Sequence, residues 1–186
     1  MVKEDKRKQI IKSAYKVFAQ KGYENASIKD IASEANITPG LIHYYFKNKE
    51  ELLLSVQHTL QEKYHKQYDD RTKRNILFQE VLQEIKSRSE KDPDWYRFRY
   101  EIYSLGLKNK EIEREVIDIL NMGRKSLSNP LREIGIEEAD EMASLLIACF
   151  DGLALQKIID KDFDIDRSYI LLERLITNHL STSDER

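Results

Sequence analysis

Apolar residues recur at helical spacing along most of the chain, and strand-like alternation is scarce. Between residues 6 and 21 they form one stripe that includes Ile10, Ala14 and Phe18, and Gly22 follows where a left-handed residue commonly ends a helix. The pattern therefore predicts a first helix over residues 6–21.

Two short helices are predicted next. Ser27 and Asp30 have the S-x-x-D spacing of a capping box, which starts a helix that ends near residue 35. Asn36 tolerates a left-handed turn, and Thr38 and Pro39 suit the cap and first position of a third helix over residues 39–44. Because two residues are too few for an antiparallel hairpin, the two helices are expected to meet at a steep angle, as in a helix-turn-helix.

The rest of the chain also has helical periodicity. Asn48 and Glu51 form a further cap pattern, and the charged run Asp69–Arg74 interrupts the periodicity. The predicted helices cover residues 48–68, 75–89, 93–105, 109–133, 137–161 and 166–180. Pro130 is expected to kink the helix over residues 109–133. The predicted fold class is all-α, and the helix from residue 48 joins an N-terminal head to a C-terminal body.

The helix over residues 137–161 is apolar around most of its circumference, so both of its sides must be covered. Together with the last helix it forms either the interface of a symmetric pair or the centre of a monomeric core. We favour the pair, because a single recognition helix makes few base contacts. The expected interface residues are Leu145, Cys149, Gly152, Leu153, Gln156, Leu172, Leu175 and Ile176.

Aromatic residues occur on both sides of the helix over residues 93–105, which suggests a cavity or ordinary core packing. The expected lining of a cavity is Phe78, Trp95, Phe98, Tyr103, Met122 and Phe150. Glu101 near these rings would suit a cationic ligand, so the predicted ligand is small and apolar, aromatic or cationic.

Charge is unevenly distributed, although the net charge is only −2. Residues 1–50 carry ten Lys and Arg against six Asp and Glu, whereas the remainder has an excess of acidic residues. A basic head on an acidic body fits a protein that touches phosphates at one end. Within the head, Lys49 opposes the dipole of the helix that it starts, which suggests a phosphate contact or a solvated lysine. If it is a phosphate contact, replacing Lys49 should lower the salt dependence of DNA binding by about one unit.

The segment from Ser27 to Leu52 resembles the DNA-binding signature of the TetR/AcrR repressors. The resemblance covers about residues 8–55 and implies a nine-helix TetR-like homodimer, with a helix-turn-helix domain over residues 1–47 and a ligand-binding and dimerisation domain over residues 48–186. Carried over, the expected DNA contacts are Ser27, Thr38, Pro39, Gly40, Leu41, His43, Tyr44, Tyr45 and Lys49. His43 stands where the family usually has tyrosine and Asn36 where glycine is common, so the role of His43 is open.

Other features narrow the function and location. Cys149 is the single cysteine, so no disulfide can form within the chain. The charged start of the chain does not fit a signal peptide, and no run of 18 apolar residues is present to span a membrane. The expected location is cytoplasmic. No nucleotide-binding, metalloprotease or metal-ligand motif is found, so we expect no enzyme, no cofactor and no metal.

The predicted function is a repressor that a small-molecule inducer releases from a palindromic operator. The first alternative is a helix-turn-helix protein without small-molecule control. The second is a small helical binding or catalytic protein whose head only resembles the motif.

Overall fold

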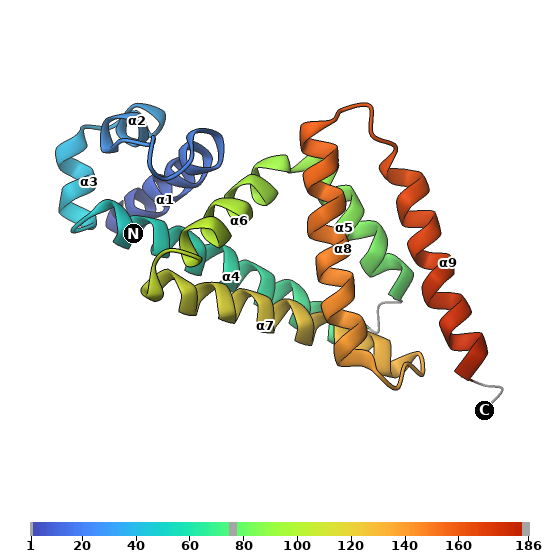
Figure 1. Ribbon diagram of the computed structural model, residues 1–186. Helices are drawn as coiled ribbons and strands as arrows, with labels where there is room; N and C mark the ends of the chain where they lie inside the picture. Colours follow the sequence, from blue (N-terminus) through green and yellow to red (C-terminus); the bar gives the residue numbers. More distant parts are fainter. Residues whose placement is uncertain (1, 75–77, 184–186) are drawn as a thin grey trace. The chain divides into compact units, whose positions relative to one another are not determined.

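A computed structural model describes the backbone of residues 2–74 and 78–183 and the side chains of residues 4–63 and 79–178. Within those ranges the fold is all-α, as predicted (Figure 1). The helices are α1 (Val2–Lys21), α2 (Ile28–Glu34), α3 (Pro39–Tyr45), α4 (Lys49–Arg74), α5 (Phe78–Lys91), α6 (Pro93–Gly106), α7 (Lys110–Glu133), α8 (Ala139–Ile159) and α9 (Ile165–Ser183).

Local sequence signals set the helix ends in the head. The amide of Gly22 donates to the Phe18 carbonyl at 2.9 Å, and its φ of +76° is the left-handed conformation that glycine adopts without strain. Asn36 has a φ of +50°, and the Asn36 and Ile37 amides donate back to Ser33 and Ala32. This is the Schellman ending of a helix, and it turns the chain from α2 into α3 within two residues.

One sequence prediction of a helix end was wrong. Residues Asp69–Arg74 were expected to interrupt the fourth helix, but α4 continues through Arg74. This segment contains neither glycine nor proline, and charge alone does not break a helix. The Asn48 cap at the other end is confirmed, because its side-chain oxygen accepts the Glu51 amide at 2.7 Å.

The chain divides into two compact units whose bounds differ from residues 1–47 and 48–186, and the division into DNA-binding and ligand-binding domains stays a prediction. The first contains residues 1–70 and 97–116, and the second contains residues 71–96 and 117–186. In the first unit α1 packs on α2 and α2 on α3. Tyr15 of α1 meets Phe98 of α6 edge to face, with ring centroids 5.6 Å apart. The fully buried side chains of this unit include Ile10, Phe18, Ile31, Ile42, Phe46, Leu52, Leu53, Phe98, Ile102 and Ile112.

The second unit is centred on α8, which packs against α5 and α9. Leu146, Ile147 and Phe150 of α8 belong to one buried apolar cluster with residues of α5, α7 and α9. The Phe150 ring stacks on the ring of Tyr169, with centroids 5.9 Å apart. Burial of this face secures α8, whereas Leu145, Ala148 and Cys149 on its other face are exposed.

By length and composition alone, α8 is apolar enough to cross a membrane, although the sequence contains no uninterrupted run of 18 apolar residues. However, the helix carries Asp140, Glu141, Asp151 and Lys157 and buries a row of side chains in the core of its own unit. A core helix satisfies the same length and composition criteria. Its character is therefore that of a core helix with a second apolar face.

Candidate nucleic-acid interface

Helix α3 is attached to the head by two buried side chains and exposes most of the others. Ile42 and the capping residue Phe46 are buried, whereas Thr38, Pro39 and Gly40 at the start of the helix are exposed. Thr38 is the N-cap residue, as predicted, but its side chain makes no capping hydrogen bond. The start of α3 thus presents side chains that the helix does not use for its own stability.

Gly40 lies in an open position. A Cβ atom added there would meet no atom within 4 Å apart from the adjoining backbone of its own helix, so packing against other elements does not require a glycine. Its small size leaves room for an external partner to approach the backbone of α3.

Four further predicted contacts lie along α3. His43 and Tyr44 are exposed, and Leu41 and Tyr45 are half-buried. The rings of Tyr44 and Tyr45 meet edge to face with centroids 5.1 Å apart. Neighbouring positions on a helix face different directions, so Tyr44 points outward and Tyr45 partly inward.

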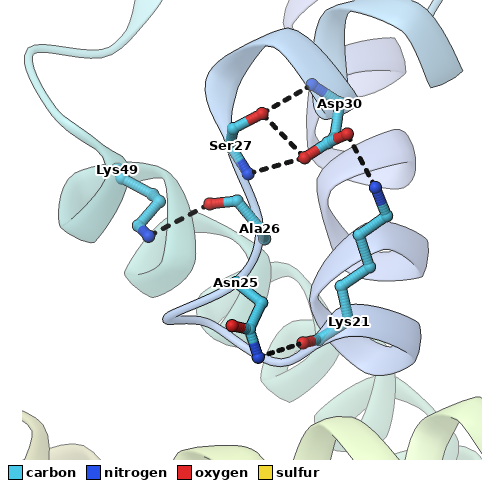
Figure 2. Close-up of polar contacts among 6 residues, drawn as sticks. All are labelled: Lys21, Asn25, Ala26, Ser27, Asp30 and Lys49. Atoms are coloured by element: carbon cyan, nitrogen blue, oxygen red, sulfur yellow. Dashed lines mark hydrogen bonds and ion pairs between the residues drawn. The ribbon is translucent and has the colours of Figure 1, made fainter.

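Ser27 forms the predicted capping box at the start of α2 (Figure 2). Its hydroxyl accepts the Asp30 amide at 3.1 Å and donates to the Asp30 carboxylate at 2.7 Å, while the same carboxylate accepts the Ser27 amide. Lys21 donates to the other carboxylate oxygen at 2.6 Å. These bonds from Lys21 and Ser27 hold the pKa of Asp30 well below its usual range. Because the Ser27 hydroxyl proton is directed at Asp30, a phosphate would have to compete for it.

The structure gives Lys49 a role that the sequence did not suggest. Its ammonium group donates to the carbonyl oxygens of Tyr23 at 2.7 Å and Ala26 at 3.1 Å, and the second of these bonds is drawn in Figure 2. It also lies 4.3 Å from the centroid of the Tyr23 ring. The predicted phosphate contact stays a prediction, since two of the three ammonium protons already have partners within the head.

The contact between Tyr23 and Glu101 was not expected, because the sequence associated Glu101 with a cationic ligand. The Glu101 carboxylate accepts the Tyr23 amide at 2.6 Å within the first unit, so its proposed contact with a ligand stays a prediction. No local signal could have revealed this bond between residues 78 positions apart.

The residues predicted to line a ligand cavity are divided between the two units. Phe98 and Tyr103 belong to the first, and Trp95, Met122 and Phe150 belong to the second. The side chain of Phe78 lies outside the described residues. Phe98 and Phe150 are buried and pack on Tyr15 and Tyr169 respectively, so a cavity at these residues stays a prediction.

Of the eight predicted dimer residues, Leu145, Cys149, Gln156 and Leu175 are exposed, and the other four are half-buried or buried. Leu145, Cys149, Gly152 and Gln156 occur at helical spacing along one stripe of α8, and Leu145 is 63% exposed. Leu175 of α9 is 58% exposed, and Leu153 and Leu172 are half-buried against the apolar cluster. Ile176 is a correction. It is only 4% exposed and belongs to the core of its own unit, because its neighbour Leu175 occupies the outward position.

A short exposed helix joined by a tight turn to a partly buried one defines the helix-turn-helix class of DNA-binding proteins. Residues 10–56 match the family described as bacterial regulatory proteins of the tetR family. Residues 10–56 therefore carry the DNA-binding domain of this family, and the relatives and solved structures that the chain resembles are transcriptional regulators and not enzymes.

Individual relatives support the same family. The HTH-type transcriptional regulator PksA of Bacillus subtilis is 28% identical over 84% of this chain and 80% of its own length. The uncharacterized regulator YuxN of the same organism is 50% identical, but the match spans 28% of this chain and only 18% of YuxN. A regulator from Saccharomonospora viridis, solved in complex with choline, has the same fold with a TM-score of 0.81, 22% identity and coverage of 94% of this chain and 96% of that one.

Proposed function

We propose that this protein is a homodimeric repressor that reads a palindromic operator with α3 of each copy and is released by a small-molecule inducer. The main support is the orientation of α3, whose buried Ile42 and Phe46 leave Thr38, Pro39 and Gly40 facing outward. In this arrangement Thr38 to Leu41 read base edges, whereas Tyr44 and Tyr45 contact phosphates. Because a repressor must reach the DNA that it binds, we propose that the protein is cytoplasmic.

Dimerisation is proposed to occur through the outward faces of α8 and α9. Their exposed large apolar side chains are Leu145, Leu155, Ile159, Ile170, Leu171 and Leu175. Exposed apolar side chains in this number are a feature of protein interfaces. Gly152 has no atom of the chain within 4 Å of an added Cβ, so a partner helix can approach it closely.

DNA binding is tested by selecting bound fragments from random double-stranded DNA. We expect an inverted repeat whose half-sites are centred about 34 Å, or about ten base pairs, apart, because two symmetric recognition helices then enter successive major grooves. In a second measurement, Thr38→Val should change the preferred sequence while the overall salt dependence of binding persists. Recovery of unrelated fragments without a repeat would contradict operator reading.

The proposed inducer is a small apolar, aromatic or cationic molecule. The S. viridis relative was solved with choline, a cation, and this chain has a Trp95–Tyr96 ring pair with centroids 4.6 Å apart in its second unit. The Arg88 guanidinium lies 5.0 Å from the Trp95 ring centroid, so a bound cation would have to displace it or use another ring face.

Choline and a panel of neutral aromatic compounds provide the test of ligand control. A true inducer should raise the melting temperature and also release the selected operator. Compounds that stabilise the protein without releasing DNA would favour the alternative of a helix-turn-helix protein without small-molecule control. The burial of Phe98 and Phe150 against their own neighbours is the observation in favour of that alternative.

A further inference from the structure

The loop between α1 and α2, residues 22–26, is held by two charged side chains from distant parts of the first unit. Lys49, at the start of α4, donates to the Tyr23 and Ala26 carbonyls, which are 26 and 23 positions away. Glu101, in α6, accepts the amide of the same Tyr23. The Lys49 ammonium therefore binds the carbonyl oxygen of Tyr23, while the Glu101 carboxylate binds the amide of the same residue.

The surroundings of Tyr23 strengthen both contacts. Lys49, Glu101 and Tyr23 are all half-buried, so water screens their charges less than it would on an open surface. The Lys49 ammonium also lies over the Tyr23 ring, and this ring packs beside Phe18 with centroids 5.8 Å apart. Burial, reinforced by the nearby carboxylates of Glu50 and Glu24, raises the pKa of the Tyr23 phenol, so the ring stays neutral beneath the ammonium.

The loop leads directly into the helix-turn-helix. Ala26, whose carbonyl Lys49 binds, is buried and immediately precedes Ser27, the N-cap of α2. Helix α2 in turn packs on α3. The position of the loop consequently sets where α2 begins and, through α2, where the exposed face of α3 lies.

We propose that Lys49, Tyr23 and Glu101 form a clamp that positions α2 and α3 for operator reading, and that Lys49 promotes DNA binding through this clamp instead of through a phosphate contact. The proposal rests on the proposed DNA-binding function. Lys49 and Glu101 are positioning residues, because both act on DNA through the loop.

The two roles of Lys49 make different predictions about salt. A lysine on a phosphate displaces a counterion, so its loss lowers the slope of log affinity against log salt by about one unit. A lysine that holds a loop displaces none, so its loss lowers the affinity at every salt concentration by a similar factor. The two mechanisms can therefore be separated without a structure of the complex.

The first experiment compares Lys49→Met with Lys47→Met across a salt series on the selected operator. Lys47 is a fair control because it is an exposed cation two residues away. We expect Lys49→Met to weaken binding about tenfold, the effect of losing a charge-assisted hydrogen bond, with the salt slope unchanged. A slope lower by one unit, with the affinity recovering at low salt, would overturn the clamp in favour of a phosphate contact.

The second experiment uses Glu101, whose carboxylate accepts a hydrogen bond from the Tyr23 amide within the first unit. Glu101→Ala should speed hydrogen exchange of the Tyr23 amide and weaken operator binding, again with an unchanged salt slope. Glu101→Gln keeps an acceptor oxygen, so both properties should be largely restored. Melting curves of both variants identify any general loss of folding, which would lower binding together with all amide protection.

The outcomes separate the clamp from the function on which it rests. Full operator affinity in a folded Glu101→Ala variant, or an unchanged Tyr23 exchange rate, overturns the clamp even if the wild type binds DNA well. Failure of the wild type to bind any DNA counts against the proposed function. The Tyr23 exchange rates then still decide whether the clamp exists.

Discussion

Tyr169 carries a buried hydroxyl in an otherwise apolar cluster. Its side chain is 5% exposed, and among the described residues its oxygen has no hydrogen-bond partner. Burial raises the pKa of the phenol, so the group stays protonated and neutral. A buried hydroxyl without a partner has lost its bonds to water and gained none in return, which destabilises the fold.

Replacing Tyr169 with phenylalanine should therefore stabilise the protein. The ring and its stacking on Phe150 are kept, and removal of the unsatisfied hydroxyl should raise the free energy of unfolding by about 1 kcal/mol. Urea unfolding measures the change. Phe150→Leu is the control, since it disturbs the same stack and should destabilise. A less stable Tyr169→Phe variant would mean that the hydroxyl has a partner, such as an internal water.

Substitution of Gly40 is expected to change operator affinity without lowering the stability of the fold. An added Cβ atom meets nothing within 4 Å outside the adjoining backbone, so Gly40→Leu should leave the melting temperature unchanged or slightly higher, because leucine favours helix more than glycine does. Operator affinity should fall about tenfold or more, since the new side chain occupies space that the duplex needs. Thermal melts and gel shifts of the same sample provide the comparison. Undiminished binding would place Gly40 away from the DNA.

At the scale of single elements, the cap of α2 should resist acid. The Lys21 and Ser27 bonds lower the pKa of the Asp30 carboxyl below its ordinary value of 3.8. A depressed pKa means that the cap contributes its full stability above that ordinary value and loses it only as the pH falls through the lower, folded-state pKa. Asp30 should therefore stay ionised at pH 4.

The measurement is an NMR titration of the Asp30 carboxyl carbon. We expect a midpoint below 3.8 in the wild type and a rise toward that value in Lys21→Met, because the Lys21 hydrogen bond is the largest cause of the shift. A wild-type midpoint at or above 3.8 would show that the capping box does not persist in solution.

The helix ends were predictable where the signal is local. Gly22, the pair Ser27 and Asp30, and Asn36 each act on backbone groups within five residues, so the sequence alone shows their roles. Lys49 illustrates the limit. Its unfavourable position at a helix start was visible in the sequence, but its partners 23 and 26 residues away were not. Sequence analysis could identify the anomaly but not explain it.

The same limit applied to faces of helices in the body. Helical periodicity places Leu175 and Ile176 on the apolar side of α9, but only packing against the cluster around α8 decides which of them turns inward. The sequence likewise grouped Phe98 with Phe150, although the structure assigns them to different units. Composition predicts that such apolar residues are buried, whereas the tertiary fold determines which other residues cover them.

At the scale of the whole molecule, dimerisation should depend on the uncovered faces of α8 and α9. Leu145→Glu and Leu175→Glu each place a charge where a second copy is expected to exclude water, so both should yield monomers in sedimentation velocity. Operator affinity should fall about tenfold or more, because a monomer reads only one half-site.

Leu107→Glu is the matched control for these variants. Leu107 is 89% exposed and belongs to the other unit, outside the proposed interface, so this variant should stay dimeric and bind DNA normally. Dimers that survive both interface substitutions would exclude α8 and α9 as the contact.

The unit that holds the helix-turn-helix is interrupted in the sequence, since it combines residues 1–70 with residues 97–116. A chain cut after Asp70 would lack the buried Phe98, Ile102 and Ile112, and also the Glu101 carboxylate that binds the Tyr23 amide. During synthesis on the ribosome, the N-terminal helices emerge first but must wait for residue 116 before their unit is complete. Nascent chains shorter than this should remain open to proteases and unable to engage DNA.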